Sequence, residues 1–130
     1  MELPQRVVDL LSRNDVLVYL ATVLPDGSPH VAPLWVDVDE QRGLILLNTA
    51  DGRVKVRNIR RDRRVALAAH DPTNPWPPLS IRGEVVNIET EGADQHIDLL
   101  SRKYNGEPWE PVPGQVRLIL EIRSDHVQLA

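Results

Sequence analysis

The feature that most constrains the fold of this chain is a succession of six short apolar runs, separated by turn-forming residues. The runs contain β-branched residues, and several of them alternate apolar and polar positions, which is typical of strands with one buried face. They are Val16–Val23, Pro29–Val38, Leu44–Thr49, Arg63–His70, Leu79–Ile88 and Gln115–Ile122. Their short connections predict an antiparallel sheet, and closure into a small barrel would remove its exposed edges.

The residues between these runs support the same interpretation. Pro25–Ser28 is a turn sequence, because proline fixes φ and Gly27 accepts a left-handed conformation. Asp39–Gly43 is a polar turn, and the four prolines of Asp71–Pro78 exclude regular structure. Gly83 interrupts an alternating run and predicts a bulge in that strand.

Three segments have helical patterns. Leu3, Val7, Leu10 and Leu11 predict a short amphipathic helix that ends near Asn14. Arg53–Arg61, directly after Gly52, predicts a second short helix. Thr90–Tyr104 repeats apolar residues at helical spacing, and we expect Thr90 to cap its start.

Composition limits the class of protein. With 130 residues, the chain is expected to form a single domain over residues 1–130, with a core of Val, Leu, Ile and Ala because it contains no Phe. The absence of cysteine excludes disulfides and thiolate metal sites, and the four widely spaced histidines predict no metal site. The beginning of the chain does not resemble a signal peptide, and no run has membrane-spanning length, so we expect a cytoplasmic protein.

Positive charge is concentrated between Arg53 and Arg64, in a chain whose net charge is −4. The stretch holds seven basic residues and one acid, Asp62, so the remainder of the chain carries a net charge of about −10. A local basic site on an acidic protein indicates a bound anion. The stretch also lacks the aromatic residues on which bases stack, so we expect neither a nucleic-acid nor a membrane partner.

The beginning of this stretch has the local features of a phosphate site. A helix that starts after Gly52 presents backbone N–H groups without intrahelical partners at its positive end. Arg53 and Lys55 add charge, and Asn48 and Thr49 at the preceding strand end can donate hydrogen bonds. The simpler interpretation is a solvated surface whose arginines pair with acids, and the pattern alone leaves both open.

The run from Gly52 to Asp62, G-R-x-K-x-R-N-x-R-R-D, resembles the signature of the pyridoxamine-phosphate-oxidase-like split β-barrel superfamily. More narrowly, it resembles the branch of flavin and deazaflavin oxidoreductases that use coenzyme F420. The T-x-x-x-D-G-x-P pattern from Thr22 to Pro29 supports the resemblance, whereas Arg63 replaces the family's usual proline. The resemblance covers about residues 10–122 and implies a mainly β fold, a six-stranded antiparallel split β-barrel of the FMN-binding type.

The same resemblance implies a cofactor site. The positions that match the family's phosphate contacts, with their strand-end neighbours, are Arg53, Lys55, Asn58, Thr49 and Ala50. His30 and Pro33 lie on the strand that usually runs beside the flavin or deazaflavin ring. We expect F420 rather than FMN, because F420 carries a phosphodiester and a tail of carboxylates for which surplus cations are available: Arg57, Arg60 and Arg61.

The function implied is transfer of a hydride between reduced deazaflavin and a small unsaturated substrate. Hydride transfer requires mainly placement, so no catalytic residue is assigned. The alternatives are an FMN-dependent oxidase or reductase of the same fold, and a non-catalytic carrier or sensor of F420 or flavin. The substrate itself is not encoded in any recognisable motif.

The resemblance also implies a homodimer with the cofactor between the two barrels. Trp35 is expected on the outward face of its strand as a dimer contact. Trp76 and Trp109 lie in proline-rich loops, where they would either plug the barrel ends or cover the substrate.

Overall fold

The computed structural model describes residues 2–129, which form seven strands and three helices. In chain order the elements are α1 (Gln5–Leu11), β1 (Val18–Val23), β2 (Pro29–Leu34), β3 (Asp37–Asp39), β4 (Leu44–Ala50), α2 (Val54–Arg61), β5 (Arg64–Ala69), β6 (Leu79–Glu89), α3 (Ala93–Asn105) and β7 (Arg117–Leu129).

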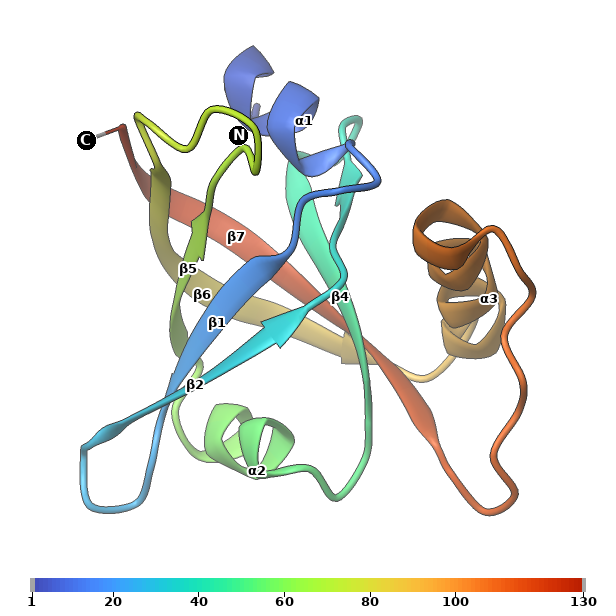
Figure 1. Ribbon diagram of the computed structural model, residues 1–130. Coiled ribbons are helices and arrows are strands. Elements are labelled where there is room, and N and C mark those ends of the chain that lie inside the picture. The colour runs from blue at the N-terminus through green and yellow to red at the C-terminus, as the bar shows by residue number, and fades with distance from the viewer. Residues whose placement is uncertain (1, 130) are drawn as a thin grey trace.

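All seven strands belong to one antiparallel sheet with the order β2-β1-β5-β6-β7-β4-β3. The two edge strands, β2 and β3, are consecutive in the chain, so the sheet curls until its edges meet (Figure 1). The result is a split β-barrel, as expected, but with seven strands rather than six.

The additional strand arises because the run Pro29–Val38 is not one continuous strand, which corrects the sequence interpretation. It breaks at Trp35 and Val36, between β2 and β3. The N–H of Val36 donates to the hydroxyl of Tyr104 (3.2 Å), and its carbonyl accepts from Nζ of Lys103 (2.7 Å). These α3 side chains satisfy the backbone that a neighbouring strand would otherwise bond, so the ladder is interrupted there.

Two other boundaries differ from expectation. β7 continues to Leu129 rather than ending at Ile122, because its polar C-terminal half pairs with β6 while its first half also pairs with β4. α3 begins after Gly92, whose φ of 78° is left-handed, and Thr90 makes no side-chain cap. Thr90 contributes only its carbonyl, which accepts from the N–H of Ala93 (3.1 Å).

The helices cover the barrel at different places (Figure 1): α1 and α2 lie at opposite ends, and α3 lies outside the sheet beside β4 and β7. Leu11 of α1 and Ile59 of α2 are fully buried in the same core as the inward residues of the strands. Burial of one face of each short helix supplies the stability that its length alone does not. Within residues 2–129, no helix is both long and apolar enough to cross a membrane.

Gly83 marks a bulge in β6, as predicted, with the register shifting between Arg82 and Gly83. A Cβ added at Gly83 would lie 1.9 Å from the carbonyl oxygen of Arg123 on β7. Only glycine therefore allows the two backbones to approach this closely.

We predict that Gly83→Ala lowers the free energy of unfolding by at least about 2 kcal/mol, because the backbone of β7 must move to admit the methyl group. Urea denaturation followed by circular dichroism measures the loss. Ser80→Ala, at an exposed position of the same strand, is the matched control and should change stability by less than about 0.5 kcal/mol. Equal midpoints for the two variants would contradict the close approach.

Candidate functional site

A cavity of about 370 Å³ lies where the chain before β1, the strands β2, β4 and β7, the helix α3, the start of α2 and the Trp109 loop converge. Its lining combines apolar residues, among them Leu17, Pro33, Trp35, Ile97 and Trp109, with three cations, Arg53, Lys55 and Arg117. A mostly apolar hollow with a few convergent charges is the usual form of a small-molecule site.

A larger hollow of about 620 Å³ lies elsewhere, over the outer face of β1, β5 and β6. Most of the charges at its rim are already paired: Arg64 with Asp62 (2.7 Å), and Glu84 with Arg123 (2.8 Å). Size alone would favour this hollow, but the smaller cavity holds the concentrated positive charge. The cationic cavity is therefore the stronger candidate site.

The three cations reach the cavity from two distant parts of the chain. Arg53 is the N-cap residue of α2, Lys55 lies in the first turn of that helix, and Arg117 begins β7. The β4–β7 pairing places Arg117 opposite Ala50, just before the turn that leads to α2. Neither Arg53 nor Lys55 has a side-chain hydrogen bond or ion pair with any other residue in the range 2–129.

The electrostatics of the cluster indicate a site for an anion. Burial lowers the pKa of Lys55, and repulsion from Arg53 and Arg117 lowers it further. Burial likewise lowers the pKa of Arg117, and repulsion from Arg53 adds to the effect. Partly buried cations without a counter-charge are costly, and a bound phosphate would relieve both the desolvation and the repulsion.

The start of α2 adds backbone donors at the same place. Gly52 has a φ of 90°, and Arg53 makes no side-chain cap on the helix. The backbone N–H groups of Val54 and Lys55 have no hydrogen-bond partner within the described chain. Such groups, at the positive end of the helix dipole, favour a bound anion.

Arg117 is held by its own contacts. Its Nε donates to Oδ1 of Asn48 (3.0 Å), and one terminal nitrogen donates to Oε1 of Gln115 (3.1 Å). Its guanidinium carbon lies 5.1 Å from the centre of the Trp109 ring, within cation–π range. These neutral partners fix the side chain without cancelling its charge.

Two tryptophans, Trp35 and Trp109, also line the cavity. Trp35 stacks on Tyr104 with ring centres 5.3 Å apart, and Trp109 meets Trp35 edge-on at 6.3 Å. The backbone N–H of Trp109 donates to Asp98 of α3 (2.9 Å), which anchors the loop. Trp35 therefore has aromatic partners within its own chain. Trp76 lies elsewhere with 70% of its surface exposed, so it plugs no barrel end.

The structure brings together only part of the predicted site. Five of the predicted residues border the cavity: Pro33, Asn48, Thr49, Arg53 and Lys55. Ala50 is buried directly beside it at the end of β4. Both Nδ2 hydrogens of Asn48 are directed to other partners, the carbonyl of Ala93 (2.9 Å) and Nδ1 of His96 (3.1 Å). The expectation that Asn48 donates to a phosphate is therefore wrong.

Asn58 and His30 lie outside the cavity lining. Asn58 is 2% exposed and donates to Oγ1 of Thr22 (3.0 Å), so it joins α2 to β1. His30 lies on the partly buried face of β2, opposite Thr22 in the β1–β2 ladder. Its Nδ1 is buried and has no hydrogen-bond partner among residues 2–129.

The three cations expected to bind a tail have partners on the outer side of α2. Arg57 donates to the carbonyl of Gly52 (2.9 Å), Arg60 pairs with Asp51 (2.8 Å), and Arg61 donates to the carbonyl of Val23. All three are exposed and none borders the cavity. Val56 and Ile59 on the opposite side of the helix are fully buried, as predicted.

Arg117 is the main residue that the sequence analysis missed. A lone cation at the start of the apolar run RLIL was a weak signal, because one arginine at a strand end is usually solvent-exposed. Only the β4–β7 pairing shows that it lies near Arg53.

Comparison with known proteins identifies the family. Residues 3–129 match the family model described as pyridoxamine 5'-phosphate oxidase, so the chain belongs to that family. A solved structure of an F420 reductase is 30% identical to this chain, with a TM-score of 0.83, and the match covers 97% of this chain and 98% of that one.

Two more distant structures share the fold. A conserved hypothetical protein from Mycobacterium tuberculosis is 24% identical, with a TM-score of 0.70, over 98% of this chain and 83% of that chain. A putative pyridoxamine 5'-phosphate oxidase from Listeria innocua is 17% identical, with a TM-score of 0.70, over 96% of this chain and 95% of that chain.

The charge repulsion within the cluster can be measured directly, because Lys55 and Lys103 are the only lysines in the chain. We predict that Arg53→Gln raises the pKa of the Lys55 amine, since it removes one repelling charge but not the burial. Side-chain NMR titration of both lysines measures the change. Lys103, whose pKa is lowered by burial and raised by Asp37, serves as the internal control. A shift at Lys103 as large as that at Lys55 would contradict the cluster.

Proposed function

We propose that this protein is an F420-dependent oxidoreductase that transfers a hydride between reduced deazaflavin and a small unsaturated substrate. The observation that carries the proposal is the cationic cavity, in which three cations, two of them with lowered pKa values, share the lining with Trp35 and Trp109. Family membership and the 30% identity to an F420 reductase support the cofactor class.

The residues of the cavity fit the phosphate end of such a cofactor. Arg53 and Lys55 would bind the phosphate, together with the free N–H groups at the start of α2. Arg117 would complete the charge balance from the side of β7. The fit rests on partly buried cations that lack a counter-charge, which is the chemistry an anionic ligand requires.

When bound, reduced deazaflavin supplies the hydride. The protein would position the ring and the acceptor and exclude water, so that no acid–base pair is required. Pro33, Trp35 and Trp109 border the same cavity and offer flat apolar surfaces for this purpose. The sequence analysis gave two roles for Trp109, plugging a barrel end or covering the substrate, and this proposal takes the second.

The preference for F420 over FMN depends on Arg57, Arg60 and Arg61, outside the cavity. Exposed ion pairs such as Arg60 with Asp51 contribute only about 0–1 kcal/mol, so a tail of carboxylates would compete for these arginines at little cost. The same contacts also favour FMN as the cofactor. If these three arginines stay with their partners in the chain, only the three cations of the cavity remain, and they suit the single phosphate of FMN. An FMN-dependent oxidase or reductase is therefore the second candidate.

A homodimer is part of the proposal. Tyr19 of β1 and Val31 of β2 are 42% and 59% exposed, and the register places them with Ala21 and Pro33 on the outward face of the sheet. A second copy packed there would remove this apolar surface from water. Sedimentation velocity that shows only monomer at micromolar concentration would refute the dimer.

We predict that wild type binds F420 at least tenfold more tightly than Lys55→Ala, because the variant loses a charge-assisted contact worth about 1.5–3 kcal/mol. Side-by-side titrations of F420 and FMN, followed by fluorescence, measure both affinities. Arg6→Ala, which removes an exposed cation from α1, is the control and should bind like wild type.

The result of that titration separates the candidates. Preferential binding of FMN supports the second candidate, and failure of both cofactors to bind wild type refutes the whole proposal. If F420 binds but its reduced form reacts with none of a panel of enones, quinones and nitro compounds, the protein is a carrier or sensor rather than an enzyme.

We also predict that a deazaflavin without the tail binds more weakly than F420 and that added salt reduces the difference, because exposed charge pairs are screened. Isothermal titration calorimetry at low and high salt measures both affinities. A triple variant with Gln at positions 57, 60 and 61 should bind the two ligands equally. Equal affinities for wild type at low salt would exclude a tail-binding role for these arginines.

A further inference from the structure

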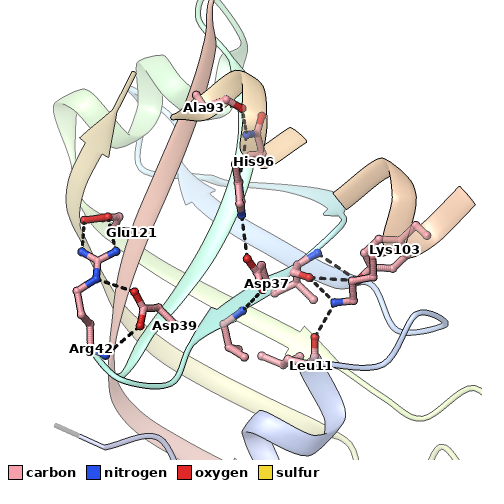
Figure 2. Close-up of polar contacts among 12 residues, drawn as sticks. Leu11, Asp37, Asp39, Arg42, Ala93, His96, Lys103 and Glu121 are labelled. Atoms are coloured by element: carbon pink, nitrogen blue, oxygen red, sulfur yellow. Dashed lines mark hydrogen bonds and ion pairs between the residues drawn. The ribbon is translucent and has the colours of Figure 1, made fainter. Parts of the chain in front are cut away.

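A chain of partly buried hydrogen bonds runs from the cationic cavity to Asp37 of β3. Arg117 Nε donates to Oδ1 of Asn48 (3.0 Å), and Nδ2 of Asn48 lies 3.1 Å from Nδ1 of His96. On the other side of the ring, Nε2 of His96 lies 3.1 Å from Oδ2 of Asp37. Figure 2 shows the end of this chain, where the His96 ring points at the Asp37 carboxylate.

The partners of Asn48 fix the orientation of its amide. The Arg117 guanidinium can only donate and the carbonyl of Ala93 can only accept, so Oδ1 must face Arg117 and Nδ2 must face Ala93. The second Nδ2 hydrogen then points at Nδ1 of His96, which has to accept it. Both Nδ2 hydrogens of this 5% exposed side chain thereby have a partner, and Oδ1 accepts from Arg117.

The same argument assigns the tautomer of His96. With Nδ1 acting as an acceptor, a neutral imidazole carries its proton on Nε2 and donates it to Asp37. A second proton, on Nδ1, would place an N–H donor of the ring opposite the N–H donor of the Asn48 amide. Asn48 would then have to rotate, and Arg117 would lose its acceptor.

We propose that Asn48 is a positioning residue for Arg117 in the cationic cavity, and that His96, oriented by Asp37, holds the Asn48 amide in the orientation that this requires. An amide suits the task because it accepts a hydrogen bond without neutralising the guanidinium. A carboxylate at this position would pair with Arg117 and remove the positive charge that the cavity presents.

The charged surroundings of His96 come from several elements. Asp37 of β3 contacts its ring, and Lys103 of α3 acts on Asp37. Arg117 of β7 lies beyond Asn48 and is influenced by Arg53 next to α2 and by Asp94 of α3.

This inference rests on the proposed function only for the identity of the natural anion. Sulfate is a suitable probe for the cavity itself, because it remains a dianion between pH 5 and pH 8. If sulfate binds and the variants below behave as stated while F420 and FMN both fail to bind, the inference stands and the proposed function falls.

The first experiment determines the tautomer in the full-length chain. Nitrogen-15 NMR of the imidazoles at pH 8 should show His96 neutral, protonated at Nε2 and unprotonated at Nδ1. In Asn48→Asp the new carboxylate can accept from Nδ1, so the ring should become doubly protonated at the same pH. A wild-type ring protonated at Nδ1 overturns the assignment, whether or not any variant folds.

The second experiment measures sulfate affinity by NMR titration of the Arg117 Nε–H resonance. Asn48→Asp should bind sulfate about tenfold more weakly than wild type, the effect of losing a charged contact. Asn87→Asp is the matched control, since Asn87 donates to Glu121 away from the cavity and should keep wild-type affinity. No sulfate binding to wild type, or equal losses in the two variants, overturns the proposal.

The third measurement separates positioning from a structural role. At pH 8, His96→Leu, whose side chain cannot accept the Asn48 N–H, should bind sulfate on the order of fivefold more weakly than wild type, whereas His96→Gln, whose amide oxygen can accept it, should bind within about twofold of wild type. Equal losses in the two variants, or wild-type affinity in His96→Leu, overturn the coupling.

Discussion

The backbone of Val36 forms hydrogen bonds to two side chains of α3 instead of to a neighbouring strand, and much of the structure depends on this. The contact ends β2, begins β3 and leaves the barrel split at that joint. It also fixes α3 against the sheet, because the hydroxyl of Tyr104 donates to Val16 (2.6 Å) and Lys103 donates to Leu11 (3.0 Å). In Figure 2 the Lys103 amine lies between the end of α1 and the β2–β3 joint. Burial lowers the pKa of this amine, which only the nearby Asp37 carboxylate opposes.

Once α3 is fixed, it determines the geometry of the cationic cavity. Tyr104 provides the surface on which Trp35 stacks, and Asp98 anchors the loop that carries Trp109. Ala93 and His96, at the start of the same helix, orient Asn48, which in turn contacts Arg117. The two tryptophans and the third cation of the cavity therefore depend on one helix that contributes only Ile97 directly to its lining.

The cavity concentrates positive charge in a chain whose net charge is −4. Like charges that are partly buried destabilise a fold unless something compensates them. Six of the thirteen arginines form ion pairs with carboxylates within residues 2–129, as Arg13 does with Asp15 and Asp71 (both 2.7 Å). Arg53, Lys55 and Arg117 have no such ion pair in that range, and they differ from the other unpaired cations in bordering one cavity, where burial and mutual repulsion lower the pKa values of Lys55 and Arg117.

The sequence by itself determined the local structure. Alternating apolar runs, turn residues and helical spacing located the three helices and most strands, and Gly52-Arg53-Val54-Lys55 pointed to two cations that border the cavity, because these patterns depend on neighbours in the chain. Only the tertiary structure decided which cations face one another. Arg117 joins Arg53 through the pairing of β4 with β7, whereas Asn58, Arg57, Arg60 and Arg61 turn to partners outside the cavity. Contacts between residues far apart in the chain depend on how the sheet curls and where α3 docks, and no local pattern encodes either.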